Sequence, residues 1–151
     1  MKIAPKEPVF PIPDNFQSFD IISINFRHFA IWLREPLWEA LEGGVVEIQF
    51  PWNDSAKEEN RVNRLNVLPL RALELFTLVQ NELRSQQSQA VFCEANKEYC
   101  NVAIITPVPQ IVLKVLQNLH CPDSFAVPSF SILETAPKGY LQNKSEVLLA
   151  Y

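Results

Sequence analysis

Apolar and polar residues alternate along several short segments of the chain, and this pattern predicts β-strands. In residues 19–26, apolar side chains at Ile22, Ile24 and Phe26 alternate with polar ones, as on a half-buried strand. Further strands are predicted at 45–50, 90–93, 101–105, 130–134 and 146–150. The polar turn at 96–98 makes a hairpin of the segments 90–93 and 101–105. Residues 28–33 are compatible with either an extension of the first strand or the start of a helix.

Apolar residues that recur every three or four positions predict helices in other segments. The clearest is 68–83, where an apolar stripe from Leu68 to Leu83 must face a core. A second helix is predicted at 108–119, ending before Pro122, with these residues inward: Ile111, Val112, Val115 and Leu119. A short helix is predicted at 35–42, ending at Gly43-Gly44. Residues 53–64 are polar without an apolar period, which predicts an exposed loop with room for a helical turn.

The order of these elements predicts the fold class. From residue 45 to residue 134 the order is strand, helix, strand, strand, helix, strand, which is that of ferredoxin-like split β-α-β folds. We therefore predict one α+β domain over residues 16–151, with a mainly antiparallel or mixed sheet and two or three helices. Residues 1–15 carry Pro5, Pro8 and Pro11 and predict an extended proline-rich N-terminal arm. Packing of this arm on its own domain is favoured over docking into a partner's groove.

Composition and charge narrow the classes of partner. The chain has 151 residues, 48% of them hydrophobic and 20% charged, which is enough apolar material for a packed core. Its net charge of −4 and its scattered Lys and Arg residues argue against nucleic acid and against an anionic membrane surface. We find no signal peptide and no apolar run long enough to span a membrane. An odd number of cysteines, three, then favours reduced thiols and a cytoplasmic location.

Glycine and cysteine carry the evidence on catalytic chemistry. Only Gly43, Gly44 and Gly139 occur, so a phosphate-cradling glycine-rich loop has nowhere to form. The residues Cys93, Cys100, His120 and Cys121 match a zinc set by type, with Cys93 and Cys100 able to face each other across the hairpin. Their spacing lacks the close ligand pairs of zinc sites, so burial of small thiols is the favoured interpretation. We predict no metal and no cofactor.

Aromatic residues suggest a binding surface instead. Phe26, Phe29 and Trp32 follow one another at three-residue steps, which suits a core stripe, while tryptophan is also the typical anchor of an interface. The candidate interface residues are Trp32, Trp38 and Trp52, with Trp52 expected to be exposed beside the charged loop. We expect a non-catalytic protein-interaction or regulatory domain that recognises a protein partner or associates with itself as a homo-oligomer. The alternatives are a small-molecule-sensing domain and, less favoured, an enzyme that uses Cys93, Cys100 or Cys121.

Overall fold

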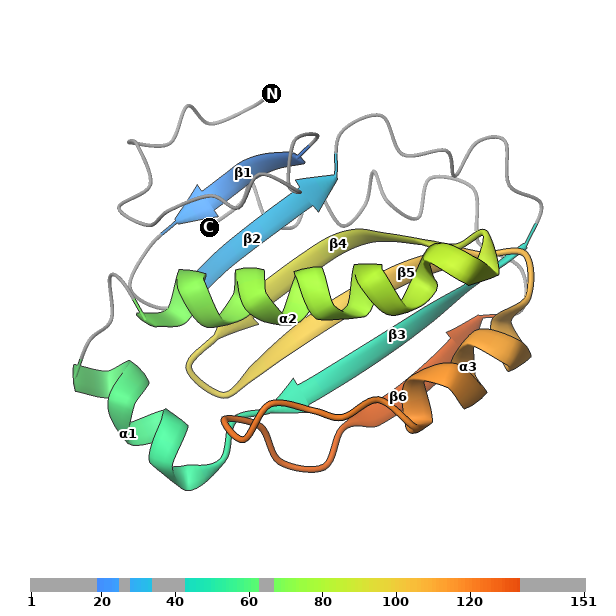
Figure 1. Ribbon diagram of the computed structural model, residues 1–151. Coiled ribbons are helices and arrows are strands. Elements are labelled where there is room, and N and C mark those ends of the chain that lie inside the picture. Colours follow the sequence, from blue (N-terminus) through green and yellow to red (C-terminus); the bar gives the residue numbers. More distant parts are fainter. Residues whose placement is uncertain (1–18, 25–27, 34–42, 63–66, 134–151) are drawn as a thin grey trace.

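The computed structural model of the chain describes residues 19–24, 28–33, 43–62 and 67–133 (Figure 1). Four predictions lie outside these residues. They are the proline-rich arm over 1–15, the short helix over 35–42, the interface residue Trp38 and the strand over 146–150.

Six strands form one antiparallel sheet in the spatial order β1-β2-β4-β5-β3-β6. Residues 28–33 are a strand rather than a helix, and they form a hairpin with the first strand. This placement puts neighbouring residues on opposite faces, so Phe29 and Trp32 do not share the helical stripe that their spacing suggested. The strands are β1 (Phe19–Ile24), β2 (His28–Leu33), β3 (Gly44–Pro51), β4 (Gln89–Asn96), β5 (Tyr99–Thr106) and β6 (Ser129–Leu133).

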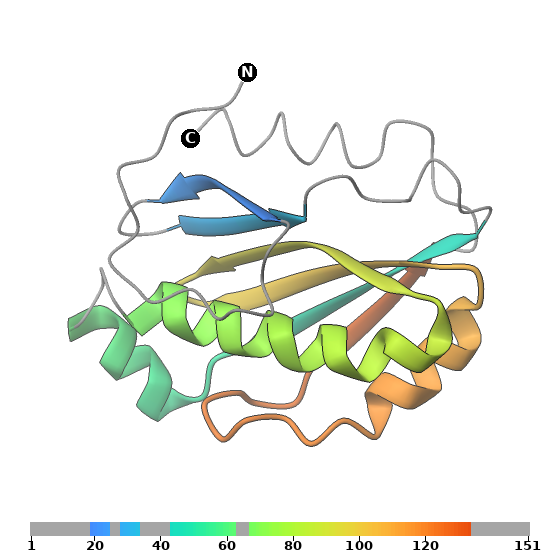
Figure 2. The same cartoon turned by 45° about the horizontal axis from the view of Figure 1, so that its top comes forward.

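The described residues include three α-helices, which lie on one face of the sheet (Figure 2). They are α1 (Asp54–Val62), α2 (Val67–Leu83), which a short 3₁₀ turn at Arg84–Gln86 extends, and α3 (Pro109–Gln117). The long helix α2 packs over β4 and β2, and α3 packs over β3 and β6. The predicted α+β class, with an antiparallel sheet and three helices, is therefore confirmed.

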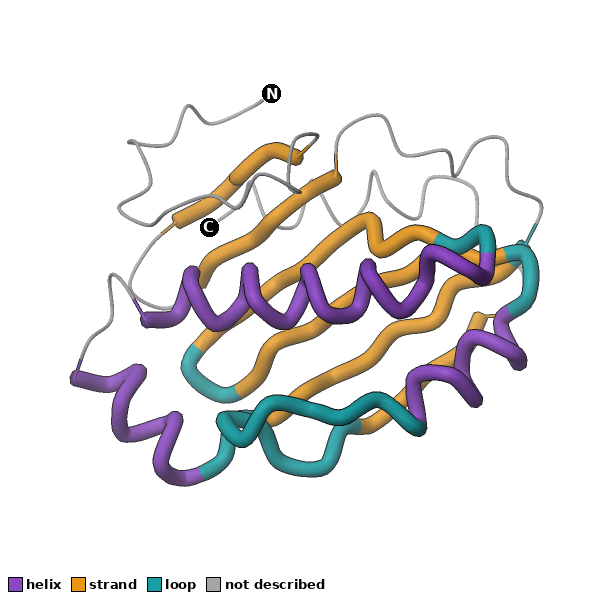
Figure 3. The backbone as a smooth tube through the Cα atoms, in the orientation of Figure 1, coloured by secondary structure: helices purple, strands orange, loops and turns teal. Residues whose placement is uncertain are grey.

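The region from β3 to β6 contains the predicted alternation of strands and helices. Its strands lie in the order β4-β5-β3-β6, and the β1–β2 hairpin extends the sheet beside β4 (Figure 3). The helix α1 is an additional element between β3 and α2. A ferredoxin-like arrangement of this region stays a prediction.

The prediction of a loop over residues 53–64 is wrong, because α1 occupies most of that segment. Asn53 caps this helix: its Oδ1 accepts a hydrogen bond from the backbone N–H of Ala56 at 2.8 Å. Ala56 is also the buried residue of α1 that joins the main core. The segment is poor in apolar residues, so the local signals for this helix were the Asn53 cap and the acidic Asp54 in its first turn.

Buried apolar residues form a cluster on each face of the sheet. The larger cluster lies under the helices and includes Phe76 and Val79 of α2 together with Ile48, Phe50 and Ile104 of the sheet. The smaller cluster belongs to the opposite face and consists of these residues: Ala30, Val45, Val91, Phe92, Ala103 and Ile105. A register shift between Ala90 and Phe92 lets both Val91 and Phe92 join this second cluster.

The predicted inward face of α3 is partly wrong. Val112 and Leu116, one helical turn apart, are the buried pair, whereas Ile111 is 51% exposed. Gln110, Lys114 and Gln117 recur at helical steps and mark the polar side of this helix, opposite Val112. Ile111 lies at the border between the two sides, and the contacts with β3 and β6 leave it outside the core.

Candidate functional site

The segment from Pro107 to Leu133, which contains α3 and β6, is nearly free of charge. We call it the α3–β6 edge. Only Lys114 and Asp123 are charged among its 27 residues, compared with 20% of the whole chain. Depletion of charge relative to the remaining surface is a feature of interface cores.

Three large hydrophobic side chains are exposed in the part of the chain whose side chains the structure describes, and all three belong to this edge. Val127 is 86% exposed, Ile111 51% and Leu133 39%. Leu133 pairs with Val45, next to Gly44 and Thr106, so it lies at the end of the sheet from which α3 departs. Val127 precedes β6 at the opposite end of the strand. The exposed apolar residues are therefore distributed along one edge of the molecule.

The backbone around Val127 is held in place by contacts with the end of β3. The ring of Phe125 stacks on Trp52 with ring centroids 4.5 Å apart. The N–H of Ala126 donates to the carbonyl of Pro51 at 2.7 Å, and the N–H of Asn53 donates to the carbonyl of Ser124 at 2.9 Å. Val127 thus points into solvent from an anchored loop. Anchoring of this kind lowers the entropic cost of binding a partner.

The edge strand β6 lacks the features that usually protect a strand edge from pairing. Its five residues, SFSIL, include no charge and no proline, and its register with β3 runs without interruption. The opposite edge of the sheet differs, because β1 carries Asp20 and a register shift between Ile21 and Ser23. Among the described residues, β6 is paired only with β3. Its outer backbone groups therefore have no strand partner within the described part of the chain.

Charged residues gather on another part of the molecule, around α1, α2 and the β4–β5 turn. Lys57 and Glu98 form an ion pair at 3.6 Å. Arg71 of α2 contacts both Glu59 and Glu74 at 3.4 Å. Exposed pairs like these contribute little stability. These ion pairs lie on α1, α2 and the β4–β5 turn, whereas the segment of the α3–β6 edge carries only Lys114 and Asp123.

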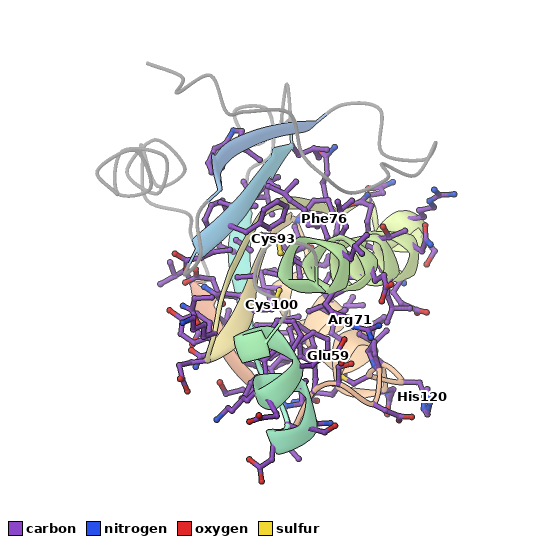
Figure 4. The ribbon with its side chains drawn as sticks, turned by 90° about the vertical axis from the view of Figure 1, so that its left-hand side faces the viewer. Glu59, Arg71, Phe76, Cys93, Cys100 and His120 are labelled. Carbon is purple, nitrogen blue, oxygen red and sulfur yellow. The ribbon has the colours of Figure 1, made fainter. Side chains whose placement is uncertain are left out.

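Two thiols meet beneath α2, as the sequence suggested. The Sγ atoms of Cys93 on β4 and Cys100 on β5 are 3.4 Å apart, and both residues are fully buried (Figure 4). Burial raises the pKa of the Cys93 thiol well above its ordinary value, and Cys100 and the negative charge of Glu94 raise it further. A thiol held in its protonated form is a poor nucleophile and a poor metal ligand. This pair therefore has the properties of core packing.

The other two residues of the suggested zinc set do not join this pair. His120 is exposed and lies away from the two thiols in Figure 4. Cys121 packs at the border of the main core, where burial raises the pKa of its thiol. Within the described ranges, no group of three or more His, Cys, Asp or Glu side chains is arranged to hold a metal ion.

The tryptophans predicted to form an interface have different environments. Trp52 is only 2% exposed, so the prediction that it is exposed is wrong. It is buried because its ring stacks on Phe125 and its Nε1–H donates to the carbonyl of Asn96 at 2.7 Å. Trp32 is half-buried and meets the ring of Phe92 edge-on, with centroids 5.4 Å apart. The residues that sequence reasoning missed are Ile111, Val127 and Leu133, although the low charge of 107–133 was a signal for them.

Comparison with protein-family models gave no match for this chain. Comparisons with curated proteins and with solved structures gave no match either. None of the described helices combines the length and apolar character that crossing a membrane requires. The candidate site is therefore defined by geometry and surface chemistry, which point to the α3–β6 edge.

Proposed function

We propose that this chain is a non-catalytic protein-interaction domain and that the α3–β6 edge is its binding surface. The observation that carries the proposal is the coincidence, along one edge, of an unprotected strand, anchored exposed apolar side chains and depleted charge. Each of these features costs solubility in an isolated domain. A partner that covers the edge removes that cost.

A binding role also agrees with the state of the thiols. An enzyme that used Cys93 or Cys121 would need a lowered thiol pKa, and burial raises both. Thiol titration against pH tests this alternative. A thiol of the folded chain that reacts rapidly near neutral pH would favour the cysteine-dependent enzyme.

The proposal is tested by placing a charge on the edge without disturbing the core. The variants Ile111→Glu and Val127→Glu change side chains that are already exposed, so the fold should tolerate them. Asn81→Glu on α2 is the matched control, because it adds the same charge at an exposed position outside the α3–β6 edge. Circular dichroism and thermal unfolding should show that all three variants fold like the wild type.

Partners, including other copies of the chain, are then identified by cross-linking and mass spectrometry and reconstituted from purified components. We expect at least one complex to weaken about tenfold or more with either edge variant, because an introduced carboxylate must be desolvated in the interface. The Asn81→Glu control should bind like the wild type. If the edge variants and the control change the affinity of every complex equally, the binding surface lies elsewhere and the proposal is overturned.

A further inference from the structure

We infer that the occupant of the α3–β6 edge is a second copy of this chain, joined through antiparallel pairing of β6 with the same strand of the partner. The inference rests on the proposed function and specifies its partner. The side chains of the five residues of β6 alternate between the two faces of the sheet. Phe130 and Ile132 point toward the helices, and the other face carries Ser129, Ser131 and Leu133.

Symmetry selects one register for this pairing. A two-fold axis perpendicular to the sheet keeps the helices of both copies on one face, which requires paired residues to point to the same side. Pairing centred on Ser131 meets this requirement and is the register that pairs all five residues of β6. Centring the axis on Phe130 or on Ile132 would leave strand residues unpaired. The pairing of Ser131 with Ser131 of the second copy therefore defines the assembly.

Side chains brought together in this register are complementary. Phe130 lies opposite Ile132 of the second copy, and the reciprocal pair repeats the contact, which gives two pairs of aromatic and β-branched residues. Both residues are half-buried in one copy, where they pack at the border of the main core. On the other face Ser131 meets its own counterpart, and Ser129 lies opposite Leu133. No charged side chain of β6 enters the contact.

Charge placement favours contact at this edge. The chain carries a net charge of −4, so two copies repel one another at long range. The exposed acidic residues Glu74 and Glu98 belong to α2 and the β4–β5 turn, which are separated from β6 in the sheet order by β3 and β5. Approach along β6 brings together two copies of a strand that carries no charged residue. A contact made by one short strand is small, so we expect a dissociation constant on the order of 10 μM.

The first test measures self-association of the whole chain by sedimentation velocity at about 1 to 300 μM, a range that brackets the expected constant. We expect a monomer–dimer equilibrium for the wild type and a shift of about tenfold or more toward monomer for Ser131→Lys, because two introduced lysines face each other at the axis. Gln49→Lys is the matched control, since Gln49 is exposed on the interior strand β3. It should dimerise like the wild type.

A charge swap separates loss of pairing from loss of folding. Ser131→Glu alone should also be monomeric, whereas a mixture of Ser131→Lys and Ser131→Glu chains should form a mixed dimer through opposite charges at the axis. A mixture that stays monomeric while the wild type dimerises would overturn the inference.

Disulfide trapping tests the register, in a Cys121→Ser background that removes the most accessible native thiol. Under mild oxidation Ser131→Cys should form a covalent dimer, since directly paired residues lie within disulfide range. Ser129→Cys alone should not, because the two copies of that position are offset by four residues, about 13 Å. Mixing Ser129→Cys with Leu133→Cys chains should restore the link. Equal trapping by Ser129→Cys alone contradicts the register.

These outcomes distinguish failure of the inference from failure of the proposed function. A chain that is monomeric at every concentration, but whose complex with another protein weakens with Ile111→Glu or Val127→Glu, overturns self-pairing and leaves the interaction role intact. A dimer whose dissociation constant is unchanged by Ser131→Lys overturns self-pairing through β6. If no complex of the chain, with itself or with another protein, is weakened by substitutions on the α3–β6 edge, both the inference and the proposed function are overturned.

Discussion

Cys93 illustrates how one buried side chain makes the stability of the fold depend on pH. Its native pKa is raised, mainly by burial, so the folded chain holds the thiol proton more tightly than the unfolded chain does. The stability that this proton binding contributes is complete below the ordinary thiol pKa and is lost as the pH rises through the native pKa.

We therefore predict that the free energy of unfolding falls more steeply with alkaline pH in the wild type than in Cys93→Ala. The difference in slope should approach about 1.4 kcal/mol per pH unit above the ordinary thiol pKa, where the unfolded chain has lost this proton and the folded chain still holds it. Urea unfolding followed by circular dichroism measures it. Val102→Ala, which truncates the residue paired with Cys93, is the control and should keep the wild-type slope. Equal slopes for wild type and Cys93→Ala would falsify the prediction.

Trp52 links the end of β3 to the β4–β5 turn and to the loop that carries Val127. In Trp52→Phe the carbonyl of Asn96 loses the indole N–H at 2.7 Å, and the smaller ring packs less well on Phe125. We predict a loss of about 1–3 kcal/mol in the free energy of unfolding. Hydrogen exchange at the N–H of Ala126, which donates to Pro51, should also accelerate. Trp32→Phe, at a half-buried position, is the comparison and should leave that amide unchanged.

At the scale of elements, the junction between the chain at Gly43 and the end of β5 depends on a close backbone contact. A Cβ atom on Gly43 would lie 2.7 Å from Cα of Pro107 and even closer to the carbonyl oxygen of Thr106. Backbone atoms cannot yield as a flexible side chain does. This contact requires a glycine at position 43, and the predicted helix that Gly43 would cap lies outside the described residues.

We predict that Gly43→Ala costs about 1–3 kcal/mol of unfolding free energy, because β3 must shift against β5 to relieve the overlap. Thermal unfolding measures this cost. Gln49→Ala, at an exposed position on the same strand, serves as the control and should change the stability little. If Gly43→Ala is as stable as the control, the close contact does not constrain the junction.

The elements also show which parts of the fold local sequence can predict. The helix α2 was predicted nearly to its ends because its apolar stripe spans several turns, and β4 and β5 because β-rich segments flank a polar turn. Two errors concern short elements. The helix α1 is poor in apolar residues, although Ala56 joins the core, and Ile111 lies at the border between the polar and apolar sides of α3. Which of these residues are buried depends on what each helix packs against.

For the whole molecule, the position of each strand in the sheet predicts how well its backbone is protected from solvent. The central strand β5 is paired on both sides, whereas β6 is paired with β3 alone among the described residues. We predict slow amide exchange in β5 at every concentration, and exchange in β6 that slows as the chain is concentrated from about 1 to 300 μM. Mass spectrometry of deuterated peptides measures both.

The Ser131→Lys variant is the control for that experiment, and its β6 amides should exchange rapidly throughout the range. Concentration-independent exchange in β6 of the wild type would argue that its edge is not paired with a second copy. If the β6 amides of Ser131→Lys remain protected from exchange, the predicted pairing of β6 with a second copy is contradicted as well.

The sequence by itself determined the class of the fold, most of the strands and helices, and the absence of glycine-rich phosphate loops. These properties depend on local periodicity, on turn residues and on composition, which a linear sequence contains. Tertiary structure alone decided that Trp52 is buried, that Ile111 and Val127 are exposed and that β6 is an edge strand among the described residues. Burial and edge position depend on which distant segments pack together, and for that reason the α3–β6 edge became a candidate site only in the folded chain.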